Sequence, residues 1–190
     1  MNRNLILSLI ASAAIAAPMA AQAQSQNTQT GTVSLTGNVE RACMIGAPTD
    51  ANLAFGSLTD STTGRVSNVA TRSTVIPMAW CNTPSRLKMT ANVMTLGAAA
   101  PTYSTPTGFS RLVTYDANLT GWPEPLSQRP VLTAAEVATD ASGAHAATPG
   151  LTLTVSNVGA LNAAGASGDA SLVLEAGAYS GSVVIALAVY

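Results

Sequence analysis

The sequence has few charged residues and few aromatic ones, and it has a single histidine. Charged residues fill 9% of the 190 positions and the formal net charge is −1. The basic residues are dispersed rather than clustered, which argues against a surface that neutralises nucleic-acid phosphates. His145 alone leaves little acid–base chemistry near neutral pH, and the carboxylates lack the paired spacing of a glycosidase. We expect no nucleic-acid binding, no enzymatic activity and no cofactor.

Apolar residues, in contrast, are plentiful. They fill 47% of the positions, whereas disordered chains combine low hydrophobicity with high charge. The length corresponds to one folded domain. Because aromatic residues make up only 4% of the chain, its core must be built from valine, leucine, alanine and methionine.

The long apolar run of this chain lies at its N-terminus. Arg3 precedes an apolar stretch from Leu5 to Ala17, and Ala21-Gln22-Ala23 matches the A-x-A pattern of a cleavage site. A membrane anchor is the alternative, but this stretch is shorter than the roughly 20 residues that a spanning helix needs. The pattern predicts a signal peptide over residues 1–23 and an exported mature chain that is not inserted in a membrane.

Export determines the oxidation state expected of the two cysteines, Cys43 and Cys81. In an oxidising compartment they most simply form one disulfide. The closed loop of about 38 residues corresponds to a stabilisation of about 4 kcal/mol. Two unpaired buried thiols are the alternative interpretation. A metal site is disfavoured, because it needs three or four ligands and the chain has no second histidine.

Alternation of apolar and polar residues predicts a chain of short strands separated by turns. Such a pattern is typical of an all-β sandwich, here a single one. A run that is apolar around Pro77 favours an edge position or a bulge. One segment, residues 132–139, hints instead at a helical turn. The strand-like segments are residues 31–39, 74–81, 87–93, 113–119, 151–155 and 183–189.

The two ends of the mature chain carry the most informative features. Residues 24–31 are polar without periodicity, which predicts a free tail in front of the alternating segment 31–39. Residues 183–190 form a strand that is apolar on both faces, and at a sheet edge it would be a template for another strand. The two segments could pair within one sandwich. Alternatively, residues 31–39 could complete the sandwich of the next molecule, and such an exchange makes a filament.

Four stretches of the sequence follow one another in a recognisable order. They are Gly31–Val39 running into Cys43, then Leu53-Ala-Phe55-Gly56-Ser-Leu58, then Cys81-Asn-Thr-Pro84, and finally Ala176-Gly177-Ala-Tyr179 leading into Val183–Tyr190. In this order the chain resembles the spore coat protein U-like domain, which is the domain of archaic chaperone-usher pilins. The resemblance covers most of the mature chain, but residues 102–111 and 140–150 do not match it.

This resemblance implies an incomplete immunoglobulin-like β-sandwich that lacks its last strand. A periplasmic chaperone would lend a strand, and an outer-membrane usher would then replace it with the N-terminal extension of another pilin subunit. Residues 24–37 would be the donor-strand extension and residues 38–190 the pilin domain. The resemblance therefore implies a structural subunit of a surface pilus, or fimbrium, that serves cell adhesion and biofilm formation.

Carried onto this sequence, the resemblance also implies roles for particular residues. Donor positions would be Val33 and Leu35, with Val39 at the junction to the first strand and with Gly31 and Gly37 where a side chain would clash. Val183, Ile185, Leu187 and Val189 would line the acceptor groove, and the carboxylate of Tyr190 would anchor the chaperone.

Two other functions remain open at this stage. The chain could be a secreted coat or matrix protein of the same fold that is complete as a monomer. It could also be a lectin-like module centred on Trp122, because exposed aromatic residues often mark binding sites; packing over a loop is the competing interpretation for this residue. His145 is expected in a solvated loop, and Trp80 is expected to pack on the disulfide in the core.

Overall fold

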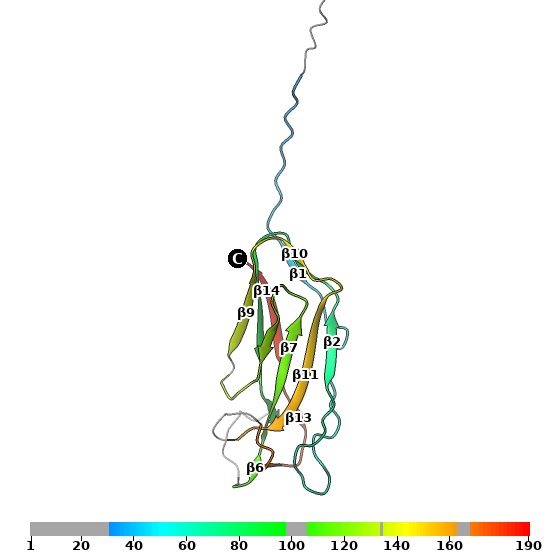
Figure 1. Cartoon of the computed structure of the whole chain (residues 1–190), viewed down its shortest axis with the longest axis vertical. Helices are drawn as coiled ribbons and strands as arrows, with labels where there is room; N and C mark the ends of the chain where they lie inside the picture. The colour runs from blue at the N-terminus through cyan, green and yellow to red at the C-terminus, as the bar shows by residue number, and fades with distance from the viewer. Residues whose placement is uncertain (1–30, 98–105, 134, 163–167) are drawn as a thin grey trace, which may run out of the picture. The chain divides into compact units, whose positions relative to one another are not determined.

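The computed structural model describes residues 31–97, 106–133, 135–162 and 168–190 (Figure 1). The expected signal peptide and polar tail, residues 1–30, lie outside this part. The chain divides into two units, residues 1–38 and residues 39–190, and every strand of the described part belongs to the second unit. The described residues contain no helix that could cross a membrane.

The second unit is an all-β sandwich. Its larger sheet has the strand order β13-β5-β7-β11-β2, with β8 also paired to β7, and its smaller sheet has the order β14-β4-β9 (Figure 1). A further sheet, β1-β3-β10, and a parallel pair, β6 and β12, complete the pairing. The strands are β1 (Cys43–Ile45), β2 (Arg72–Ile76), β3 (Ala79–Cys81), β4 (Ser85–Ala91), β5 (Met94–Leu96), β6 (Phe109–Ser110), β7 (Leu112–Thr120), β8 (Leu126–Gln128), β9 (Glu136–Ala141), β10 (His145–Ala146), β11 (Leu151–Ala160), β12 (Val173–Leu174), β13 (Tyr179–Ser180) and β14 (Val183–Val189).

Side-chain alternation decides which face of each strand is buried. In β4, Leu87 and Met89 are fully buried, whereas the intervening Lys88 is half-buried. Residues of β4 form one core cluster with inward residues of β7 and β11, such as Leu119 and Leu151. Because both sheets contribute to this cluster, they pack face to face, and aliphatic side chains dominate the core as the composition predicted.

Most of the predicted strands are confirmed. The segments expected at 87–93, 113–119, 151–155 and 183–189 correspond to β4, β7, β11 and β14. Pro77 interrupts the run at 74–81, since β2 ends at Ile76 and β3 begins at Ala79. The expected edge position is confirmed for β2, which pairs only with β11 among the described strands, whereas β3 is the central strand of the sheet β1-β3-β10.

The strand expected over residues 31–39 does not form. These residues lie outside every strand, and Val33, Leu35 and Val39 are 81%, 91% and 83% exposed. The first strand, β1, begins only at Cys43. Alternation shows that a segment can present one apolar face to a sheet, but the strand forms only where a partner supplies hydrogen bonds.

The expected helical turn at 132–139 and the expected loop around His145 are both wrong. Residues from Glu136 onward form β9, which pairs with β4, because ladder hydrogen bonds outweigh weak local helix propensity. The side chains of Lys88 and Glu136 add an ion pair across these two strands, with 2.9 Å between nitrogen and oxygen. His145 lies in β10, half-buried, and pairs with Cys81 of β3.

The predicted disulfide is confirmed. Cys43 and Cys81 lie opposite each other on β1 and β3, and their sulfur atoms are 2.01 Å apart. Trp80 does not join the core as expected. It is half-buried and precedes Cys81 on β3, so its side chain points to the opposite face of that strand.

Removing the disulfide should destabilise the sandwich substantially. We expect the double variant Cys43→Ala, Cys81→Ala to lose about 4 kcal/mol of unfolding free energy, because the unfolded chain regains the entropy of its open loop. The closed loop spans 38 residues. Urea unfolding of the variant, and of the wild-type protein in reductant, should give the same loss. An unchanged midpoint in both samples would contradict this account.

Candidate functional site

The candidate site lies beside β14, at an edge of the smaller sheet. In the described structure β14 pairs only with β4, in a continuous register from Val183 opposite Ala91 to Val189 opposite Ser85. Its other edge therefore presents main-chain N–H and C=O groups that no strand ladder satisfies. Such an edge is a template for one more strand.

The inward face of β14 lacks cover along its length. Val183, Ile185 and Leu187 point toward the core but are only half-buried. Their partners across the ladder on β4, which are Ala91, Met89 and Leu87, are completely buried. Since the two strands are neighbours in one sheet, the difference arises on the side of β14 that faces away from β4, where β1 approaches β14 but no described strand pairs with it.

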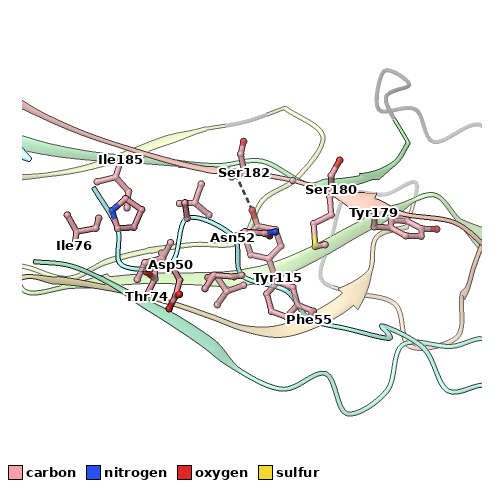
Figure 2. Close-up of a pocket in the computed structure, with 18 of the residues that line it drawn as sticks. Asp50, Asn52, Phe55, Thr74, Ile76, Tyr115, Tyr179, Ser180, Ser182 and Ile185 are labelled. Atoms are coloured by element: carbon pink, nitrogen blue, oxygen red, sulfur yellow. Dashed lines mark hydrogen bonds between the residues drawn. The ribbon is translucent and has the colours of Figure 1, made fainter. Parts of the chain in front are cut away.

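A groove of about 500 Å³ opens at this place. Val183 and Ile185 of β14 form part of its lining, and Ile76 of β2 and Leu153 of β11 supply apolar surface from the larger sheet. Figure 2 shows Ser182 and Ile185 on one side of the groove, with Ile76 and Thr74 on the other side. The groove thus lies between edge strands of the two sheets.

The segment 46–55 forms another wall of the groove. Its backbone is held at the β2 side, since the Gly46 amide donates to the Met78 carbonyl at 2.6 Å and the Thr49 amide donates to the Val75 carbonyl at 2.7 Å. Leu53 and Phe55 follow on this segment and pack, half-buried, against the core. Because these backbone bonds lead to β2 and its flank, the segment does not satisfy the edge of β14.

Tyr115 of β7 lies in the lining and fixes the start of β14. Its hydroxyl donates to the Asn92 carbonyl at 2.7 Å. The same hydroxyl lies 3.2 Å from the carbonyl of Ser182, which Figure 2 shows beside it. The residue is 3% exposed, and burial raises the pKa of its phenol to about 12. Burial likewise raises the pKa of Tyr179, which also lines the groove, to about 12. Both phenols are therefore neutral hydrogen-bond donors at physiological pH.

The residues that the resemblance assigned to the acceptor groove and to the chaperone anchor lie in different places. Val183 and Ile185 line it, and Leu187 packs against the core beyond its lining. Val189 and Tyr190 are 50% and 65% exposed and lie outside the lining. The ring of Tyr190 lies 4.8 Å from the guanidinium carbon of Arg86 instead, in a cation–π contact.

Sequence reasoning missed the remainder of the lining, above all Ile76, Leu153 and Tyr115. Their alternation identified an inward face, but an inward face gives no sign of which residues lie beneath an opening. That information resides in the sheet order, which places β2 and β14 at sheet edges. Phe55 is different, because it belongs to a stretch that the family resemblance had already singled out.

Trp122 is buried, at 6% exposure, and its ring meets His145 edge-on with 4.6 Å between the ring centroids. The packing interpretation is thus confirmed, and Trp122 is not the exposed aromatic residue that the lectin-like hypothesis requires. Within the described ranges no three histidine, cysteine, aspartate or glutamate side chains lie close enough together to hold a metal ion.

No protein-family model, no curated protein and no solved structure matches the chain.

The buried phenol of Tyr115 should make the protein sensitive to alkali. The folded pKa of about 12 exceeds the ordinary value of 10.0, so between these values the folded state keeps a proton that the unfolded state releases. Stability from this group is complete below pH 10 and falls as the pH rises toward 12, on the order of 2 kcal/mol. Urea unfolding across this interval measures the loss. The same slope in Tyr115→Phe would contradict the assignment.

Proposed function

We propose that this protein is a structural subunit of a chaperone-usher surface pilus, polymerised by donor-strand exchange. The N-terminal segment of one copy would fill the groove beside β14 of the next copy. The observation that carries this proposal is the free edge of β14, whose inward residues stay half-exposed above an apolar groove. The alternating segment around Leu35, which lies outside every strand, supplies a matching occupant.

The energetics favour a strand as the occupant. Burying the exposed side chains of Val33, Leu35 and Val39 yields about 5 to 9 kcal/mol in total. Ordering the backbone costs about 1 to 2 kcal/mol per residue, so side chains alone scarcely offset this cost. The row of unpaired groups along β14 supplies the remainder through main-chain hydrogen bonds, which only an extended chain can satisfy together.

The arrangement also favours an open polymer. The donor segment and the groove are different surfaces of one chain, so each copy can give a strand and receive one, and this head-to-tail contact does not close on itself. A groove with apolar walls and an open strand edge is prone to aggregate before assembly. A periplasmic chaperone that lends a strand would prevent this, and an outer-membrane usher would then deliver the subunit to the cell surface, where the pilus serves attachment and biofilm formation.

A coat or matrix protein that is complete as a monomer is less well supported. Such a protein would use residues 31–39 as a strand of its own sandwich, and in the described structure these residues belong to no strand. The family resemblance, with its donor extension and closing apolar strand, favours the polymer as well.

A charge on the apolar face of the donor segment should block polymerisation. We expect Leu35→Asp to give no polymer that resists sodium dodecyl sulfate, because a carboxylate would lose its hydration against apolar lining residues such as Ile76 and Leu153. Ser34→Asp is the matched control, since neighbouring residues of a strand point to opposite faces. Gel electrophoresis of unheated and heated mature protein distinguishes the two. Chaperone binding should persist in both, and normal filaments from Leu35→Asp would refute the donor assignment.

Donor and acceptor defects should complement each other in a defined way. A Leu35→Asp subunit can accept a strand but not donate one, whereas Ile185→Asp should donate but not accept, because Ile185 lines the groove. We expect the mixture to give a dimer and no longer species on a size-exclusion column. Val184→Asp, on the outward face of β14, is the control and should polymerise. Long polymers from the mixed variants would contradict the assignment of the groove.

A further inference from the structure

The chain between the donor segment and the sandwich is held by Asn82, the first residue after β3. The side-chain amide of Asn82 donates to the Glu40 carbonyl at 2.7 Å, and its side-chain oxygen accepts from the Ala42 amide at 2.7 Å. The backbone amide of Asn82 donates to the Ala42 carbonyl at 3.0 Å. We call these three hydrogen bonds the Asn82 clamp.

The clamp extends the pairing of β1 and β3 by one residue pair and adds side-chain bonds to it. β1 and β3 pair at Cys43 and Cys81, and the next pair outward is Ala42 and Asn82. β3 ends at Cys81 and the chain bends toward Pro84, so the side chain of Asn82 accepts the Ala42 amide in place of a strand carbonyl. Asparagine suits this role, because its side chain carries a donor and an acceptor in the geometry of a peptide group.

The clamp and the disulfide together fix residues 40–43 to the sandwich. The donor extension ends at residue 37, and Val39, at the junction, directly precedes Glu40, with consecutive Cα atoms only about 3.8 Å apart. A filament built by donor-strand exchange would therefore have only residues 38 and 39 as a linker between the strand that fills one subunit and the body of the next. Without the two side-chain bonds of Asn82, residues 40 and 41 would recover backbone freedom and lengthen the linker, whereas the backbone bond to the Ala42 carbonyl would remain.

We infer that Asn82 is a positioning residue that fixes how the donor segment leaves the sandwich, and thereby stiffens the joint between consecutive subunits. This inference rests on the proposed function. The residue makes no contact with the groove, since it is absent from the groove lining. Its substitution should therefore alter the shape of the filament and leave the extent of strand exchange unchanged.

The test compares filaments of the full chain, exported and assembled, in wild type, Asn82→Ala and Asn82→Asp. Asn118→Ala is the control, because Asn118 is half-buried on β7, remote in sequence from the clamp. For Asn82→Ala we expect wild-type polymer yield and detergent resistance, with a several-fold shorter persistence length in electron micrographs. Hydrogen exchange of the Ala42 amide should accelerate about tenfold in Asn82→Ala. Asn82→Asp keeps the acceptor and should retain that protection, while losing the bond to Glu40.

The outcomes separate the two proposals. Absence of wild-type filaments would refute donor-strand polymerisation, and the inference with it. Wild-type filaments together with Asn82→Ala filaments of equal stiffness would overturn the inference alone. Unchanged exchange of the Ala42 amide in Asn82→Ala would also overturn it, because the clamp would then not hold the chain. If Asn82→Ala does not accumulate, Asn82→Asp carries the test, since intermediate stiffness supports the inference and wild-type stiffness refutes it.

Discussion

The free edge of β14 is the constraint on which the rest of the structure depends. A strand whose inward residues are apolar and whose outer edge is unpaired loses stability in two ways, because its side chains stay partly hydrated and its backbone groups lack a ladder. One added strand would resolve both, because it would cover Val183 and Ile185 and pair with the edge. Under the proposed function, the groove is therefore the place of an absent strand rather than a ligand pocket.

Where the chain enters the sandwich, in contrast to the free edge of β14, the chain already has its hydrogen-bond and disulfide partners. The disulfide at Cys43 and the Asn82 clamp hold residues 40–43 firmly, while Leu35 is almost fully exposed. These two long-range links therefore mark where the sandwich begins, next to the segment that the proposed function makes available for exchange. If residues 40–43 were flexible, ordering them would cancel part of the free energy that a donor strand gains by binding in the groove.

Sequence periodicity predicted much of the fold, for reasons that particular strands make clear. β4, β7 and β11 each bury an aliphatic face, so alternation located them, whereas β14 was located as a run that is apolar on both faces. β9 was missed because its pairing with β4, rather than its own residues, makes it a strand. The groove was only partly predictable for a similar reason. Val183 and Ile185 lie on a conspicuous strand, whereas Ile76 and Tyr115 line the groove because of the order of strands in space.

Charge distribution removes a further obstacle to assembly. The chain has a formal net charge of −1, and four ion pairs in its described part, such as Arg86 with Asp140 and Arg129 with Asp116, neutralise neighbouring side chains locally. Pairs this exposed add little to stability. These ion pairs do prevent large surface regions of one charge sign. Near-neutral surfaces associate readily, because no long-range electrostatic repulsion separates the copies. Because the proposed partner is another copy of the same chain, the low net charge reduces the repulsion between the two copies that must come together.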